Sequence, residues 1–148
     1  MSTYTQSVHH IVFATKNRQP CLLKQHRPAL FQYIWGVIKN DNCHLYRING
    51  MEDRLHIATH IHPSVSVANL VKDIKIGSSL FIKEKGIFPE FTGWQDGYGA
   101  FTYAYKDKGA VIDYIKHQEE HHNTKTFKEE YAELLLEHGV VFDEKYLM

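Results

Sequence analysis

The chain has 148 residues, of which 43% are hydrophobic and 23% charged, a composition typical of a globular protein with one domain over residues 1–148. No apolar run approaches the roughly 18 residues that a membrane span needs, so an integral membrane protein is excluded. Seventeen basic and seventeen acidic residues cancel. Any nucleic-acid binding must therefore come from local patches rather than from net charge.

The N-terminal residues and the cysteines bear on the cellular location. The chain begins MSTYTQSVHH, without the basic start or the apolar stretch of a secretory signal, so we expect a cytoplasmic protein. Cys21 and Cys43 lack the CxxC spacing of a zinc site, and we expect both to be reduced and structural.

The first elements in chain order are a strand and a helix. Residues 7–15 read SVHHIVFAT, a β-branched and aromatic run that predicts a strand, and the polar stretch KNRQP ends it. From Pro28 to about Lys39 apolar residues recur at helical spacing, and proline is favoured in the first turn of a helix.

A hairpin is predicted next. The run HLYRI at residues 44–48 is followed by Asn49-Gly50, a common turn dipeptide, and by a second alternating run from Arg54 to His62. Alternation places every second residue of that run on one face. The polar face contains Arg54, His56, Ala58, His60 and His62, and the opposite face contains Leu55, Ile57, Thr59 and Ile61.

Ser66 is predicted to cap a second helix that ends near Gly86, and a fourth strand is predicted from Ala100. Asp107 is then predicted to cap a third helix over residues 110–122.

A fourth helix is predicted from Thr126, where TFKE has the pattern of a capping box, to Gly139. The tail VVFDEKYLM is predicted to be extended. The order β, α, β, β, α, β, α, α predicts an α+β fold, the ferredoxin-like split βαβ arrangement with a four-stranded antiparallel sheet and additional C-terminal helices.

Two predicted faces have residues that suit chemistry. The polar face of the 54–62 strand is costly to bury dry, so it either faces solvent or lines a metal or anion site. On the third helix, one stripe consists of Tyr114, Gln118, His121 and His122. The ordinary alternative is that Tyr114 packs on the sheet and the others face water.

Five blocks of sequence resemble the single-tyrosine HUH transposases of bacterial insertion sequences. They are VFATKNR, EDRLH, WQDGYGAFTY, YIKHQEEHH and TFKEEY, in the family order. The resemblance implies an enzyme that acts as a homodimer on single-stranded DNA with hairpin ends. It also implies a tyrosine that attacks a phosphodiester, and a divalent metal, Mg²⁺ or Mn²⁺, held by the HUH histidines and a glutamine.

Carried over by this resemblance, Tyr114 is the catalytic nucleophile, and His56 and Gln118 are metal ligands. Lys75 matches a lysine that is common in the family. We also expect DNA-phosphate contacts from basic residues after the first strand and on the second helix, although lysines on a helix are often merely solvated. The DNA-binding candidates are Arg54, Lys75, Lys16, Arg18 and Lys72.

One position departs from the family pattern. The block Asp53-Arg54-Leu55-His56 keeps the second histidine and has Arg54 in place of the first. Arginine offers no lone pair to a cation, but its guanidinium can hold a phosphate. His60-Ile61-His62 is itself a literal HUH triplet, located where the family strand runs out toward a proline.

These observations leave three hypotheses. The first is a transposase that cleaves and transfers single-stranded DNA through a 5′-phosphotyrosine at Tyr114. The second is an inactive descendant that only binds DNA hairpins, because of Arg54. The third is a metal-binding or hydrolytic protein that uses His60, His62 and the Tyr114 stripe.

Overall fold

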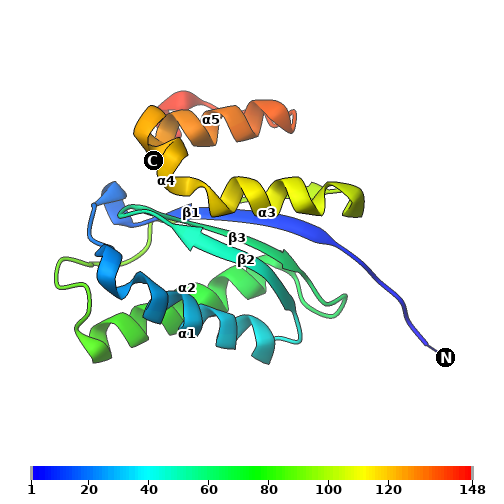
Figure 1. The fold of residues 1–148 in the computed structure, drawn as a ribbon, viewed down its shortest axis with the longest axis horizontal. Helices are drawn as coiled ribbons and strands as arrows, with labels where there is room; N and C mark the ends of the chain where they lie inside the picture. The colour runs from blue at the N-terminus through cyan, green and yellow to red at the C-terminus, as the bar shows by residue number, and fades with distance from the viewer. Residues whose placement is uncertain (1, 148) are drawn as a thin grey trace.

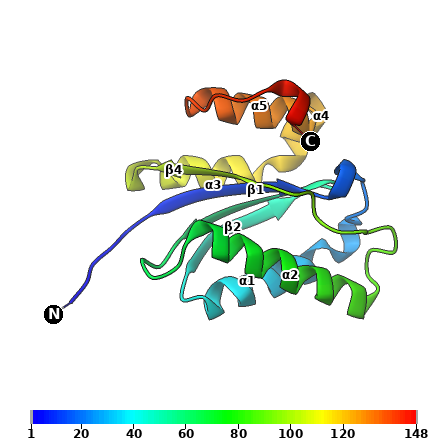
Figure 2. The same ribbon diagram turned by 180° about the vertical axis from the view of Figure 1, so that it is seen from behind.

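The computed structural model describes residues 2–147, without the side chains of residues 121–123 and 146. Its centre is an antiparallel four-stranded sheet in the order β2-β3-β1-β4, with helices on both faces (Figures 1 and 2). This confirms the predicted split βαβ arrangement. The strands are β1 (Val8–Ala14), β2 (His44–Gly50), β3 (Arg54–His60) and β4 (Gly99–Tyr103).

Helices α1 (Arg27–Asn40) and α2 (Val67–Lys85) cover one face of the sheet (Figure 1). The Ser66 hydroxyl accepts a hydrogen bond from the Asn69 backbone N–H, and Gly86 ends α2 with a φ of +63°. The predicted cap at Ser66 and the predicted helix end near Gly86 are therefore confirmed. Apolar residues from both helices and the sheet form the larger core, which includes Ile11, Leu30, Ile34, Leu55, Ile57, Leu70 and Ile74.

The prediction that the hairpin turns at Asn49-Gly50 is wrong. Both residues belong to β2, where they pair with His56 and Leu55, and the connection to β3 is made by residues 51–53. Gly50 is needed for close packing, because a Cβ there would lie 2.4 Å from the Arg54 carbonyl oxygen.

The third helix is not continuous as predicted. It is divided into α3 (Lys108–Lys116) and α4 (Gln118–Thr124), with His117 between them. Asp107 occupies the N-cap position of α3 as predicted, but its side chain makes no capping hydrogen bond. The amide Nδ2 of Asn49 donates to the carbonyl oxygens of Ile115 and Lys116, at 3.1 and 3.2 Å. These contacts satisfy carbonyls that a helix end leaves without partners. Of the predicted stripe, the side chains of His121 and His122 lie outside the described residues.

Helix α5 (Phe127–Glu137) begins with the predicted capping box between Thr126 and Glu129, and it lies over α3 on the second face of the sheet (Figure 1). The tail was predicted to be extended, but it includes a short 3-10 helix at Glu144–Tyr146. No helix among the residues described is long and apolar enough to cross a membrane. The smaller core between α5 and the sheet includes Val12, Ala14, Phe101, Phe127, Leu134 and Leu135.

Candidate active site

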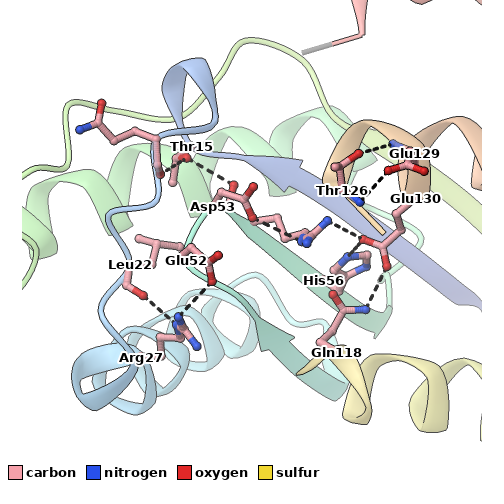
Figure 3. A network of polar contacts seen from close by, with 12 residues as sticks. Thr15, Leu22, Arg27, Glu52, Asp53, His56, Gln118, Thr126, Glu129 and Glu130 are labelled. Atoms are coloured by element: carbon pink, nitrogen blue, oxygen red, sulfur yellow. Dashed lines mark hydrogen bonds and ion pairs between the residues drawn. The ribbon is translucent and has the colours of Figure 1, made fainter. Parts of the chain in front are cut away.

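Strand β3 and three helices place polar side chains together beneath α5. Alternation along β3 turns Leu55 and Ile57 into the larger core, so Arg54 and His56 point to the opposite face. The side chains that meet them come from different elements: Tyr114 from α3, Gln118 from the start of α4, and Glu130 from α5. Figure 3 shows His56 and Gln118 directed toward Glu130.

The Glu130 carboxylate joins all four of the other residues. Its Oε1 accepts a hydrogen bond from Arg54 Nη1 at 3.4 Å and lies 3.0 Å from His56 Nε2. Its Oε2 accepts from the Tyr114 hydroxyl, and from Gln118 Nε2 at 3.2 Å. Glu130 is 2% exposed. The side chains that the sequence assigned to catalysis and metal binding are therefore brought together, but around a residue that it did not assign.

Glu130 was missed because carboxylates on helices usually face solvent. The sequence does contain a signal, since Phe127, Glu130 and Leu134 follow one another at the i, i+3, i+7 spacing of a single buried face. An acidic residue on an apolar stripe requires a polar partner in the core. Its partners, however, lie far away in the sequence: His56 is 74 positions away.

The charges at the site are balanced within a buried region. Burial by itself would raise the pKa of Glu130, but hydrogen bonding and charge from His56, then Tyr114 and Arg54, outweigh it and lower that pKa. Glu130 is therefore a carboxylate at neutral pH. Arg54 is 1% exposed, and its guanidinium also lies 3.4 Å from Asp53 Oδ1 and 5.6 Å from the centre of the Phe127 ring.

Burial raises the pKa of Tyr114 far above its ordinary value of 10, and the adjacent Glu130 raises it further, while Arg54 acts in the opposite direction. The hydroxyl is thus held as a neutral phenol. A cavity of about 340 Å³ opens onto this residue, and its lining includes His10, Tyr103, Asp107 and Leu134. Such a volume falls within the usual range of about 300–1,000 Å³ for ligand pockets.

His10 supports His56 from β1, although the sequence did not single it out. His10 Nε2 lies 2.8 Å from His56 Nδ1, and both side chains are buried. Burial, followed by the nearby His56, lowers the pKa of His10, so it is neutral at pH 7. A histidine that binds a metal through one nitrogen commonly hydrogen-bonds through the other, and His10 is placed to be that partner.

The donors here suit a hard divalent cation only in part. His56 Nε2 and the Gln118 amide face the same carboxylate, and the buried Gln118 Oε1 has no hydrogen-bond partner among the described residues. Arg54 supplies no lone pair. In the part of the chain that the structure describes, no group of three or more His, Cys, Asp or Glu side chains is arranged to hold a metal ion. His56 and Gln118 fit the role assigned to them by the resemblance.

The alternative triplet His60-Ile61-His62 does not join this site. His60 Nδ1 accepts a hydrogen bond from the Ser7 backbone N–H at 3.0 Å. His62 lies beyond the end of β3, and its Nδ1 contacts the Ser64 hydroxyl at 2.6 Å. The two histidines are therefore engaged with neighbouring serines rather than with Tyr114.

The basic candidates for DNA contact gather around Gln95. Lys16 and Arg18 lie on the 3-10 turn that follows β1, where the Asn17 backbone N–H donates to Gln95 Oε1 at 2.9 Å. Lys75 Nζ donates to the backbone oxygen of Gln95 at 2.8 Å, and also to that of Gly97. Lys16 is exposed, whereas the ammonium of Lys75 holds the loop. Lys72 is exposed on α2.

The sequence of this chain is similar to that of a known protein family. A model of the family described as "Transposase IS200 like" matches residues 3–118, a range that includes Tyr114 and Gln118 and ends before Glu130. The comparison with curated proteins gives no match.

Two solved structures share the fold. One is a candidate transposase from Deinococcus radiodurans, with a TM-score of 0.64 and 20% identity, over 80% of this chain and 95% of that chain. The other is a REP-associated tyrosine transposase bound to a REP hairpin, with a TM-score of 0.56 and 18% identity, over 78% of this chain and 70% of that chain.

Proposed function

The chain belongs to the IS200-like transposase family, and from this premise we propose that it cleaves single-stranded DNA beside a hairpin and transfers the strand through a 5′-phosphotyrosine at Tyr114. The observation that carries the proposal is the position of Tyr114. Its hydroxyl shares the Glu130 carboxylate with Gln118 and His56, and its side chain also lines an open cavity. The similar transposase bound to a REP hairpin supports the choice of substrate.

In the proposed reaction, the Tyr114 oxygen attacks the scissile phosphorus and the bond to the 3′ oxygen breaks. The products are a phosphotyrosine and a strand that ends in a 3′-hydroxyl. As the bond from oxygen to phosphorus forms, the phenolic oxygen becomes acidic and its proton passes along the existing hydrogen bond to Glu130 Oε2. The departing 3′ oxygen takes up a proton from solvent, and Glu130 releases the phenolic proton to solvent. Mg²⁺ or Mn²⁺ held by His56 and Gln118 would draw charge from the phosphate oxygens.

Arg54 is assigned to the scissile phosphate, which it would reach only after α5 moves aside, because its side chain is 1% exposed and lies against Phe127. A guanidinium can form two parallel hydrogen bonds to a phosphate, and its charge stabilises the developing oxyanion. Lys16 and Arg18 are assigned to backbone phosphates further along the strand, because they lie just beyond the end of β1, where Ala14 is paired with Arg54. Lys75 contributes by holding the loop at Gln95. We further propose that the protein acts as a homodimer, as the family resemblance implies.

A second function is favoured by one observation: Arg54 occupies the position of a metal-binding histidine. In that case the chain would bind DNA hairpins without cleaving them.

The test is incubation of the protein with Mn²⁺ and a labelled single-stranded hairpin, followed by a denaturing gel that detects covalent protein–DNA adducts. We expect an adduct with the natural chain, and its reduction to background in Tyr114→Phe, because the nucleophilic oxygen is lost. Tyr131→Phe is the matched control, since it removes a hydroxyl from a half-buried tyrosine of α5 that packs on Phe127.

Arg54→His separates the two functions. An adduct that forms only in this variant would overturn cleavage by the natural chain and favour the alternative, in which the natural chain binds hairpins without cleaving them. An adduct that persists in Tyr114→Phe would show that another residue is the nucleophile.

A further inference from the structure

Arg54 leaves the family's metal site one ligand short, and α5 places a carboxylate at that point. We propose that Glu130 is a ligand of the divalent cation and forms, with His56 and Gln118, a site of one imidazole nitrogen, one carboxylate oxygen and one amide oxygen. That a cation binds at all rests on the proposed function. That Glu130 is one of its ligands rests on the contacts of Glu130. Glu130 lies in the TFKEEY block that resembles the family, but beyond the residues 3–118 that the family model matches.

The spacing of the donors suits an octahedral ion. His56 Nε2 and Glu130 Oε1 are 3.0 Å apart. Two ligands at right angles, each at about 2.1 Å from the ion, lie about 3.0 Å from each other. A cation can therefore replace the hydrogen bond between these atoms without separating the two elements that hold them.

The third donor is an atom that otherwise has no partner. Gln118 is fully buried, and its Nε2 donates to Glu130 Oε2 at 3.2 Å, which leaves Oε1 without a hydrogen-bond partner among the described residues. Figure 3 shows the Gln118 amide and the His56 ring both directed toward the Glu130 carboxylate. A buried acceptor without a partner is unfavourable, and a cation between His56 and Glu130 would supply one.

The charge balance explains how a cation can bind beside an arginine. Arg54 would repel a divalent ion, but its guanidinium also lies 3.4 Å from Asp53, which partly neutralises it. Glu130, which is itself paired with Arg54, supplies a carboxylate on the side of the site that faces His56. The substitution of a histidine on β3 by Arg54 is thus compatible with metal binding when a carboxylate enters from α5.

The ligand set selects the class of cation. Two oxygen ligands and one imidazole, with water or phosphate at the remaining positions, suit Mn²⁺ or Mg²⁺. Mn²⁺ is the better probe, because it accepts imidazole more readily than Mg²⁺ does.

The experiment is titration calorimetry of the full chain with Mn²⁺ in the absence of DNA. In Glu130→Gln we expect binding to weaken by about tenfold or more, because an anionic ligand is lost. Glu133→Gln is the matched control: it neutralises a carboxylate of the same helix that is 58% exposed and pairs with Lys125, and its Mn²⁺ affinity should equal that of the natural chain. Equal or tighter Mn²⁺ binding by Glu130→Gln would overturn the proposal and would mean that Glu130 blocks the site.

Loss of α5 packing in Glu130→Gln would also weaken Mn²⁺ binding, so a second pair of variants separates this effect from the loss of a ligand. Arg54→Met removes the repelling charge and should bind Mn²⁺ more tightly than the natural chain. Arg54→Met/Glu130→Gln contains neither member of the buried ion pair, and circular dichroism and thermal unfolding report its folding. If the folded double variant binds Mn²⁺ more weakly than Arg54→Met does, Glu130 is a ligand. If the double variant binds Mn²⁺ as tightly as Arg54→Met, the proposal is overturned. Since no DNA is present, failure here is distinct from failure of Tyr114 to form an adduct.

Discussion

At the scale of single residues, the molecule buries an arginine and a glutamate in contact. Arg54 and Glu130 are 1% and 2% exposed, and their side chains are 3.4 Å apart. A buried ion pair is weak evidence for stability, because desolvation opposes the attraction of the charges. Because the pair lies beside Tyr114, a role in the proposed site accounts for it better than stability does.

The ionisation of Glu130 gives a pH prediction. Because its pKa is lower in the folded protein than in the unfolded chain, the unfolded chain takes up the proton first as the pH falls. The stabilisation is complete above about pH 5 and is lost as the pH drops toward the folded-state pKa. Each unit by which the pKa is lowered corresponds to about 1.4 kcal/mol.

Urea unfolding between pH 7 and pH 3 measures this dependence. We expect the free energy of unfolding of Glu130→Gln to fall less steeply below pH 5 than that of the natural chain. Glu133→Gln, which changes an exposed carboxylate, should follow the natural chain. Parallel curves for the natural chain and Glu130→Gln would contradict the lowered pKa.

At the scale of elements, the break between α3 and α4 positions the site. Asn49 on β2 pairs with His56 in the sheet, and its side chain holds the last carbonyls of α3. One residue therefore fixes the helix end relative to the strand that carries His56. Gln118 follows directly after this break.

Removal of this contact should loosen the end of α3. We predict that Asn49→Ala lowers the free energy of unfolding by about 1–2 kcal/mol, and that it also reduces adduct formation. The variant loses three side-chain hydrogen bonds: those to the Ile115 and Lys116 carbonyls, and the one that Asn49 accepts from the Gly50 backbone N–H. Asn40→Ala, at an exposed position at the end of α1, is the control for both measurements. An Asn49→Ala variant with unchanged stability and adduct yield would refute a positioning role for Asn49.

At the scale of the whole molecule, a segment beyond the matched family range completes the site. Helix α5 lies over α3 and the sheet (Figure 2), and its Phe127 is buried against β1 and beneath the guanidinium of Arg54. Packing of α5 therefore determines whether Glu130 reaches His56.

The coupling between α5 and the site is testable through Phe127. We predict that Phe127→Ala destabilises the fold by about 3 kcal/mol, and that backbone amides of α5 lose hydrogen-exchange protection before those of β1 and β3. Leu136→Ala, at a position that is 69% exposed, should leave both quantities unchanged. Uniform loss of protection across the sheet and α5 would mean that α5 does not open separately.

The sequence by itself determined the elements and the faces of most of them. Alternation along residues 54–60 placed Arg54 and His56 on the face opposite the larger core, and the helical spacing of Tyr114 and Gln118 predicted that they lie close together. Local patterns succeed here because a period of two or of 3.6 residues fixes where neighbouring side chains point. The resemblance to a transposase family, which the family match confirms, also came from the residues alone.

Only the tertiary structure decided which distant residues meet. Glu130 lies 74 positions from His56, and Asn49 lies 66 positions from the carbonyl that it binds. Periodicity gives the face on which a residue lies but not its partner on another element, because that partner depends on how the layers pack. For the same physical reason, the Asn49-Gly50 dipeptide predicted a turn although both residues belong to β2. The local preference of the dipeptide was overridden by two tertiary contacts: Asn49 binds the end of α3, and Gly50 lies close to the Arg54 backbone.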